Sequence, residues 1–265
     1  MSTGTAFEKA KADGRAALVG YLPAGFPDVD GGIEALRAMV AAGCDVIEVG
    51  LPYSDPVMDG PTVQAAAQQA LDGGFRVKDV FRTVEAVAGT GTPTVVMTYW
   101  NPVDRYGAER FARDLASAGG AGLITPDITP DYADAWIAAA DAHDLDKVFL
   151  VSPSSTDERL AMTTASCRGF VYATAVMGVT GARATTSELA APLVGRTKAT
   201  TSLPVGVGLG VSNGDQAAEI ARFADGVIVG SAFVRAVLDN ADDRKAGLRA
   251  LTALTEDLAA GVRRA

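Results

Sequence analysis

Short apolar runs recur along this chain and alternate with longer segments in which apolar residues return at a helical period. Runs such as Val95–Met97 and Val227–Val229 are apolar on both faces, as strands of a parallel sheet covered by helices are. Between two such runs, Ile33, Leu36 and Met39 follow helical spacing. The pattern predicts eight strands, at Ala16–Leu22, Asp45–Gly50, Thr94–Tyr99, Gly122–Thr125, Lys147–Val151, Gly169–Thr174, Pro204–Gly208 and Gly226–Gly230.

Eight strand–helix units of about 30 residues each predict an α/β fold, a (β/α)8 TIM barrel rather than an open doubly wound sheet, which usually has fewer strands. An extra helix over Phe7–Asp13 is expected before the first strand. Two helices, Ala65–Leu71 and Val77–Ala88, are expected between the second and third strands. No change of composition marks a boundary, so residues 1–265 are expected to form a single barrel domain.

Composition and charge exclude several classes of function. The length of 265 residues suits one barrel, and a hydrophobic content of 48% is enough for a large core. A net charge of -9 without a cluster of basic residues argues against nucleic-acid binding. The two cysteines form no CxxC pair, which argues against zinc and a disulfide framework. Without a signal-like start or a long apolar run, we expect a cytoplasmic protein with no membrane span.

Two carboxylates stand out in the stretch from Cys44 to Thr62. Glu48 lies inside an apolar predicted strand, and Asp59 lies in the proline-rich loop that follows. A carboxylate within a barrel strand is costly unless it is solvated or paired. A structural ion pair is the alternative explanation, although no Lys or Arg occurs between Leu51 and Gln64.

The single histidine also limits the chemistry that this chain can perform. His143 lies beside two aspartates in a predicted turn at a helix end, where a surface position is expected. With no other histidine, a Ser–His–Asp triad is excluded. Acid–base chemistry must therefore rest on carboxylates, with tyrosine as the other candidate.

The last third of the chain carries glycines where barrels bind phosphate. The seventh strand runs into Gly206–Ser212, and the eighth into Gly230 and Ser231 at a helix start. Backbone N–H groups and a helix N-terminus favour an anion there, although these glycines could also merely turn a tight corner. Tyr172 lies near the end of the sixth predicted strand and could be a core aromatic with its hydroxyl at the rim of the barrel. The glycine-containing loop after it, Ala175–Arg183, is either a lid or an ordinary connection.

Together these residues resemble one family, the α chain of tryptophan synthase. The loop after Glu48 is the most specific part of the resemblance, whereas the glycine runs alone are not specific. The matching stretches follow the family's order along nearly the whole chain. They are Asp45–Gly50, Pro52–Pro56, Asp59–Gln64, Tyr99–Pro102, Pro126–Asp127, Tyr172, Gly178–Gly181, Gly206–Ser212 and Gly226–Ser231.

The resemblance implies a lyase that cleaves indole-3-glycerol phosphate by retro-aldol chemistry to indole and glyceraldehyde 3-phosphate. Glu48 matches the family's catalytic glutamate and would shuttle the protons, with a pKa raised by its apolar setting. Asp59 matches the second acid and would accept a hydrogen bond from the indole N–H as that nitrogen becomes positive.

The same match implies the remaining site residues. Thr180 would close over the site and contact Asp59. The indole slot would be lined by Tyr21, Met97, Tyr99, Ile124, Tyr172 and Leu209. The phosphate would be bound by Gly181, Gly210, Gly230 and Ser231.

The family also implies that this chain needs no cofactor, metal or Schiff-base lysine of its own. Lys147, at the start of the fifth predicted strand, lies at the wrong end of the barrel for a Schiff base. The implied partner is a pyridoxal-phosphate β chain in an α2β2 heterotetramer that receives the indole. The expected contact surface is made by Pro52–Pro56, Asn101–Val103 and Thr125–Thr129.

Two other functions compete with this interpretation. One is a different phosphate-binding barrel enzyme, such as an isomerase of the same biosynthetic route, against which the Pro52–Gln64 loop argues. The other is a non-catalytic subunit that only activates a partner. A pure scaffold would have no need for two acids without basic neighbours, which argues against it.

Overall fold

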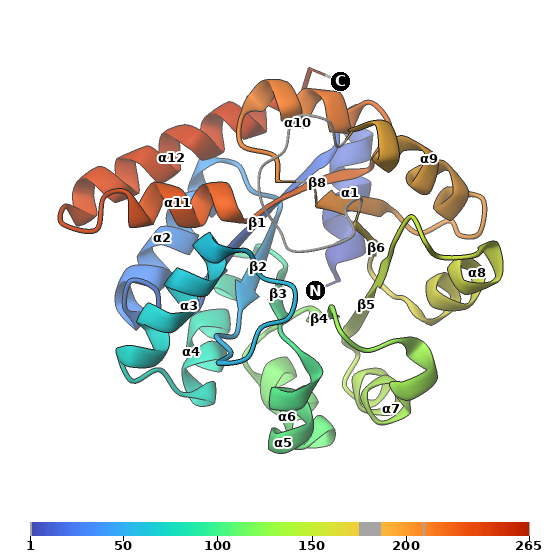
Figure 1. The fold of residues 1–265 in the computed structure, drawn as a ribbon, viewed down its shortest axis with the longest axis horizontal. Coiled ribbons are helices and arrows are strands. Elements are labelled where there is room, and N and C mark those ends of the chain that lie inside the picture. Colours follow the sequence, from blue (N-terminus) through green and yellow to red (C-terminus); the bar gives the residue numbers. More distant parts are fainter. Residues whose placement is uncertain (1, 175–186, 209, 265) are drawn as a thin grey trace.

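The computed structural model describes residues 2–174, 187–208 and 210–264. Its centre is a closed barrel of parallel strands in the order β1 to β8 (Figure 1). The strands are β1 (Ala17–Pro23), β2 (Val46–Gly50), β3 (Thr94–Met97), β4 (Gly122–Thr125), β5 (Asp146–Val151), β6 (Val171–Thr174), β7 (Val205–Gly208) and β8 (Gly226–Val229). All eight predicted strands, and with them the barrel, are confirmed.

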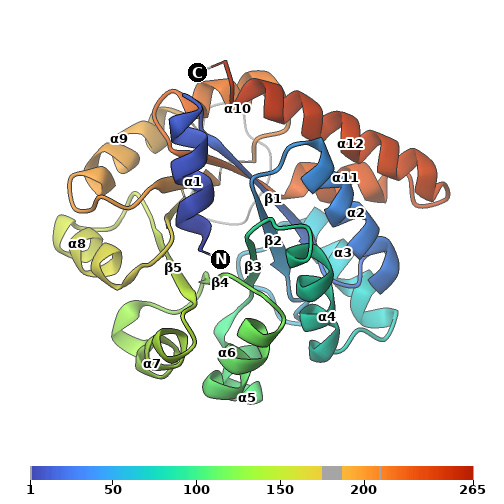
Figure 2. The ribbon, with the colours of Figure 1, turned by 180° about the vertical axis from the view of Figure 1, so that it is seen from behind.

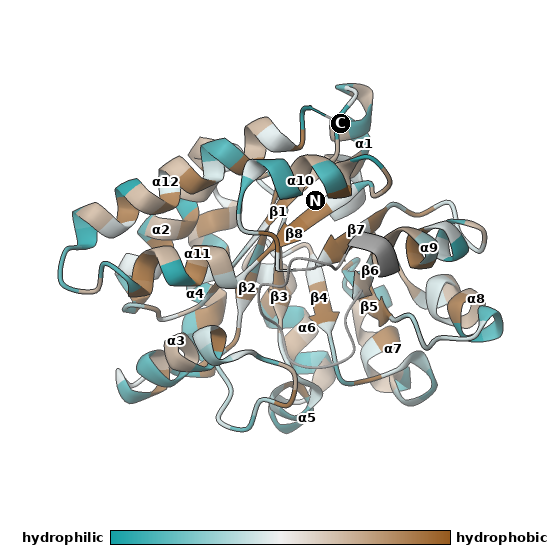
Figure 3. Ribbon diagram, turned by 45° about the horizontal axis from the view of Figure 1, so that its top comes forward, coloured by the Kyte–Doolittle hydropathy of each residue, from teal (hydrophilic) through white to brown (hydrophobic). Residues whose placement is uncertain are grey.

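Helices surround the barrel (Figures 1 and 3), and buried apolar residues of these helices pack in one cluster with the outward-facing residues of the strands. The helices are α1 (Thr3–Ala12), α2 (Val29–Ala42), α3 (Pro61–Asp72), α4 (Val77–Ala88), α5 (Trp100–Tyr106), α6 (Ala108–Ser117), the 3-10 helix η1 (Pro130–Tyr132), α7 (Asp134–Ala142), α8 (Asp157–Ser166), α9 (Ser187–Lys198), α10 (Gly214–Ala221), α11 (Ser231–Leu238) and α12 (Arg244–Gly261). Among the described residues, no helix is long and apolar enough to cross a membrane.

The element ends differ slightly from the predicted ones, for local reasons. The third strand stops at Met97 because Tyr99 is the N-cap of α5. The sixth begins at Val171, after Gly169 with a φ of 91°. Helix α3 begins at Pro61, before the predicted Ala65, because proline lacks the N–H that a first helical turn leaves unbonded.

The two faces of each strand pack into separate clusters. Val46 belongs to the cluster inside the barrel, whereas Ile47 and Val49 pack outward against the helices. Because strand side chains alternate, Glu48 follows Val46 into the interior. Phe7 of α1 stacks on Phe170 at 5.0 Å and belongs to the inner cluster, so α1 covers the N-terminal end of the barrel (Figure 2).

A buried carboxylate fastens α1 to this end of the barrel. Asp146, the first residue of β5, is fully buried. Its Oδ2 accepts from the Thr3 N–H and the Thr3 hydroxyl, both at 2.6 Å. Its Oδ1 accepts from the Ser2 hydroxyl at 3.0 Å and lies 3.3 Å from Nε of Arg168. A buried charge that is hydrogen-bonded on all sides is costly to alter.

Replacing Asp146 with asparagine should therefore lower the free energy of unfolding by about 2 kcal/mol, because one acceptor oxygen becomes a donor among donors. The midpoint of thermal unfolding should fall by roughly 4–8 °C. Asp144→Asn is the matched control, since the Asp144 carboxylate also pairs with Arg168, at 2.7 Å, but is 94% exposed. It should change stability by less than about 0.5 kcal/mol. Equal effects in the two variants would contradict this account of α1.

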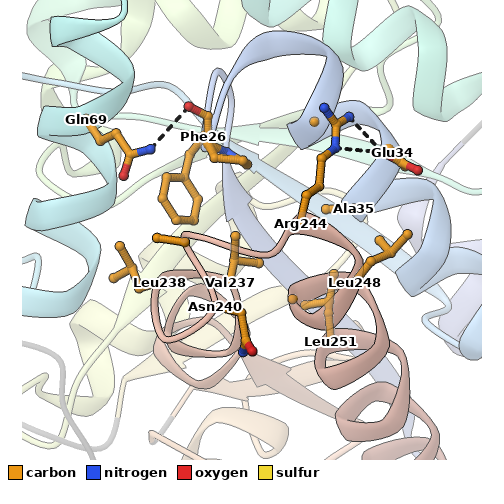
Figure 4. A pocket seen from close by; sticks show the side chains of 14 residues that line it. Phe26, Glu34, Ala35, Gln69, Val237, Leu238, Asn240, Arg244, Leu248 and Leu251 are labelled. Atoms are coloured by element: carbon orange, nitrogen blue, oxygen red, sulfur yellow. Dashed lines mark hydrogen bonds and ion pairs between the residues drawn. The ribbon is translucent and has the colours of Figure 1, made fainter.

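A small cavity lies on the outside of the barrel between α2, α11 and α12, well away from the barrel interior (Figure 4). Its volume is about 50 Å³. Phe26, Leu238 and Leu251 line it, and an ion pair between Arg244 and Glu34, at 2.7 Å, crosses its edge. An engineered protein cavity that binds benzene is about 150 Å³. The cavity is therefore a packing gap, too small for an aromatic ligand.

Filling this gap should stabilise the fold. Gly247 of α12 borders the cavity, and a Cβ added there would lie 3.4 Å from Asn240 Cβ, an ordinary contact. Gly247→Ala should raise the free energy of unfolding by about 1 kcal/mol, the difference in helix propensity, and the melting temperature by roughly 2–4 °C. Gly261→Ala in the same helix should instead lower both, because its Cβ would lie 2.2 Å from the Gly214 carbonyl oxygen. A Gly247 variant that melts lower would contradict the prediction.

Candidate active site at the barrel mouth

Glu48 points into the barrel from β2 and is 1% exposed. Its neighbours in register are Tyr21 on β1 and Val95 on β3. Its Oε2 has no hydrogen-bond partner, and no ion pair involves it among the described residues. Burial, followed by the negative charge of Asp59, raises the pKa of Glu48 to about 8. The ion-pair alternative is therefore not supported, and the expected rise in pKa is confirmed.

Asp59 lies in the loop between β2 and α3, just before the helix start. Its position is held on two sides, because Gln64 Nε2 donates to the Asp59 carbonyl oxygen at 2.7 Å and the Tyr99 hydroxyl bonds to its carboxylate. Burial raises the pKa of Asp59, and the hydrogen bond from Tyr99 opposes that rise. The pKa of Glu48 responds to the charge of Asp59, so the structure brings the two predicted acids into one site.

Tyr99 connects the β2–α3 loop to the end of β3. Its hydroxyl accepts the Met58 N–H at 2.9 Å and donates to Asp59. Its ring lies 5.5 Å from that of Tyr53, whose hydroxyl accepts from Asn101 Nδ2 at 2.9 Å. Residues just after β3 and at the start of α5 therefore hold the loop that carries Asp59, so the position of Asp59 is fixed by more than the loop itself.

Two tyrosines face Glu48 from other strands. Burial raises the pKa values of Tyr21 and Tyr172 well above the usual range; the charges of Asp59 and then Glu48 add to this at Tyr21, and the charge of Glu48 adds to it at Tyr172. Each rests against a glycine. A Cβ at Gly50 would lie 2.4 Å from the Tyr21 hydroxyl oxygen, and one at Gly208 would lie 2.3 Å from that of Tyr172. Glycine at these two positions therefore makes room for the rings.

The other predicted slot residues that the structure describes also face inward. Met97 and Ile124 belong to the inner cluster together with Tyr172. Leu150 of β5 belongs there too and was not predicted as a slot residue. The alternation of Val148 and Leu150 with Phe149 and Val151 could have identified it, because Phe149 and Val151 pack outward. Three predicted site residues, Thr180, Gly181 and Leu209, lie outside the described residues.

Two of the predicted phosphate-binding residues lie at the start of α11, and Gly210 lies in the loop between β7 and α10. Gly230 is the N-cap of α11, Ser231 is the first residue of that helix, and Gly210 has a φ of 68°. A cavity of about 380 Å³ is lined by both Gly210 and Ser231, and Gly60 at the start of α3 borders it as well. Backbone N–H groups at a helix start are suited to an anion. The geometry therefore brings the phosphate candidates together beside the loop that carries Asp59.

Other polar residues lie away from this mouth. His143 is the C-cap of α7, where its Nε2 lies 2.7 Å from Glu109 Oε1. Lys147 pairs with Asp141 at the start of β5. Both positions precede or begin a strand and so belong to the end of the barrel opposite the candidate site. Among the described residues, no group of histidine, cysteine and acidic side chains could hold a metal ion.

Comparison with known proteins identifies the family. The family described as "Tryptophan synthase alpha chain" matches residues 7–263. The chain belongs to the tryptophan synthase alpha chain family. A tryptophan synthase alpha chain of Salinispora arenicola is 64% identical over 98% of this chain and 97% of its own length. One from Acidothermus cellulolyticus is 60% identical over 99% of this chain and 97% of its own length.

A solved structure of Mycobacterium tuberculosis tryptophan synthase superimposes on this chain with a TM-score of 0.93. The two chains share 58% sequence identity, and the match covers 98% of each. The membership of the tryptophan synthase alpha chain family that the sequence predicted is therefore confirmed, and so is the predicted barrel fold.

Proposed function

We propose that the barrel mouth is where this tryptophan synthase alpha chain does its chemistry, with Glu48 and Asp59 as the acting groups. The chain is a carbon–carbon lyase that cleaves indole-3-glycerol phosphate in tryptophan biosynthesis. The observation that carries the assignment of residues is a buried, unpaired glutamate with a pKa of about 8 beside a second carboxylate. Such a pKa keeps the acid protonated near neutral pH, ready to donate.

Glu48 would act first as an acid and then as a base. Its proton goes to C3 of the indole ring, which becomes cationic. The carboxylate then takes the proton of the side-chain hydroxyl next to C3, the carbon–carbon bond breaks, and its electron pair returns to the ring. The products are indole and glyceraldehyde 3-phosphate, and Glu48 ends protonated as it began. A group with a pKa near the working pH is suited to both transfers.

Asp59 would stabilise the charge that appears between these two transfers. Protonation at C3 makes the indole nitrogen positive, so the hydrogen bond from its N–H to a carboxylate strengthens in the transition state. The Tyr99 hydroxyl bond holds the Asp59 carboxylate in place and favours its charged form. The assignment therefore gives the two acids different roles, with Glu48 neutral and Asp59 ionised.

The remaining contacts follow from the shape of the substrate. Tyr21, Met97, Tyr99, Ile124 and Tyr172 would line the slot for the flat ring, together with Leu209. The N–H groups of Gly210 and Gly230 and the Ser231 hydroxyl would bind the phosphate at the start of α11. Gly181 is proposed as a further phosphate contact and Thr180 as a contact of Asp59. No cofactor is required of this chain for these steps.

We further propose a pyridoxal-phosphate β chain as the partner, in an α2β2 complex. Val57 and Tyr132 are large apolar residues with 70% and 82% of their surface exposed. They lie beside the predicted contact segments Pro52–Pro56 and Thr125–Thr129. Absence of a size shift with the cognate β chain in gel filtration would contradict this proposal. The cytoplasmic location stays a prediction.

Incubation with indole-3-glycerol phosphate, with and without the β chain, tests the proposal directly. Indole should appear in both cases. An isomerase would convert the substrate without releasing indole. A non-catalytic subunit would activate the β chain equally well with Glu48→Gln in place, while releasing no indole itself.

A further inference from the structure

Arg235 makes a contact that the proposed reaction steps do not use. It lies on α11, one helical turn after Ser231, with its side chain exposed. Its Nη2 donates a hydrogen bond to Thr62 Oγ1 of α3 at 2.9 Å. In the part of the chain that the structure describes, no ion pair joins Arg235 to a carboxylate. The guanidinium therefore has α3 as its polar partner, across a separation of 173 residues.

This hydrogen bond joins the two elements that would hold opposite ends of the substrate. Helix α11 starts at Ser231, in the candidate phosphate site. Helix α3 starts two residues after Asp59, and its Gln64 holds the Asp59 carbonyl oxygen at 2.7 Å. The two helices pack against each other. Thr62 and Arg235 both border the 380 Å³ cavity between the helix starts.

We propose that Arg235 is a positioning residue, which acts through Thr62 to couple phosphate binding at α11 to the placement of Asp59. The inference rests on the function proposed above for these two sites. Fixing the start of α11 by a bound anion would fix the start of α3 through this bond, and with it the Asp59 loop. A hydrogen bond is worth about 1 kcal/mol net, which corresponds to a coupling of about fivefold.

The charge of Arg235 is a less suitable explanation of its role. Asp239, the C-cap of α11, follows one turn later and borders the same cavity. Its negative charge offsets that of the guanidinium for an anion in the cavity, so direct attraction of phosphate would be weakened. A directional contact to a hydroxyl, in contrast, does not depend on the net charge.

The first test measures binding only. The affinity of the whole chain for indole is determined by calorimetry with and without inorganic phosphate, at constant ionic strength. Phosphate should tighten indole binding about fivefold in the natural chain and in Thr62→Ser, which retains the hydroxyl. Thr62→Val and Arg235→Met should show less than about a twofold effect. Arg244→Met, which removes an exposed arginine of α12, is the matched control and should retain the coupling.

The second test measures turnover of indole-3-glycerol phosphate. Thr62→Val and Arg235→Met should each lower kcat about fivefold with little change in KM, and the double variant should be no worse than either. Thr62→Ser should stay within about twofold of the natural rate. Thermal unfolding of each variant checks that the fold is retained.

Three results would overturn the proposal. Equal behaviour of Thr62→Ser and Thr62→Val would show that the hydroxyl is irrelevant. A rise in KM alone in Arg235→Met, with Thr62→Val unaffected, would make Arg235 a cation for the phosphate. If phosphate did not change the affinity for indole in the natural chain, the two sites would not be coupled and the proposal would be wrong. Failure of cleavage with coupling present would instead count against the proposed function.

Discussion

Replacing Glu48 with glutamine is expected to abolish cleavage of indole-3-glycerol phosphate while leaving substrate binding nearly intact. The amide keeps the size and polarity of the side chain in its buried position on β2. It can neither give a proton to C3 nor take one from the hydroxyl. General acid–base catalysis is worth roughly 10²–10⁴ in rate, and here one group would perform both transfers. We therefore expect a loss of about 10⁴ in kcat, measured as release of indole.

The control for this variant is Glu109→Gln, which removes an exposed carboxylate at the other end of the barrel. Its rate should match that of the natural chain. In the natural chain, kcat/KM should fall as pH rises through about 8, where Glu48 loses its proton. Residual activity of Glu48→Gln within tenfold of normal would remove Glu48 from the mechanism.

The same substitution should change the pH dependence of stability. The pKa of Glu48 is raised from 4.5 to about 8 in the folded chain, so the folded state binds its proton more tightly than the unfolded state does. This contribution to stability is complete below pH 4.5 and is lost as pH rises through about 8. Glutamine does not titrate. The free energy of unfolding of Glu48→Gln, relative to that of the natural chain, should therefore increase by several kcal/mol between pH 4.5 and 8.5, as denaturant titrations would measure.

The Asp59→Asn variant is expected to lose a factor of about 10²–10³ in kcat. An amide can still accept the indole N–H bond, but it lacks the negative charge that offsets the cationic ring. Removing one preorganised partner of a developing charge costs about this much in other enzymes. The effect should be smaller than that of Glu48→Gln because no proton transfer is lost. Indole release with saturating substrate measures it.

Asp55→Asn is the matched control, since Asp55 lies in the same loop and is exposed, with its carboxylate bonded only locally to Ser54 at 2.6 Å. It should stay within about twofold of the natural rate in the isolated chain. An Asp59→Asn rate as high as that of the control would show that the charge of Asp59 does not contribute to the reaction.

Much of this architecture could be predicted from the sequence because the signals are local. Apolar runs separated by helical periods identified all eight strands, and the Glu48–Gln64 stretch identified the family. Most boundary differences had local causes, at Pro61 and Gly169, but one involves a side chain that acts across elements. Tyr99 leaves its strand to cap α5 and to hold Asp59, a choice that β-propensity alone does not reveal. The assignment of residues 1–265 to one domain and the roles of all the site residues, including Thr180, Gly181 and Leu209, stay predictions.

The sequence by itself determined the order of the elements, the family to which the chain belongs, and the placement of Glu48 in a strand and of Asp59 in the loop that follows it. Only the tertiary structure decided that Glu48 is buried, unpaired and within the field of Asp59, so that its pKa rises to about 8. It also decided that Arg235 reaches Thr62. The physical reason is that desolvation and hydrogen bonding depend on neighbours from distant segments, which barrel closure alone brings together.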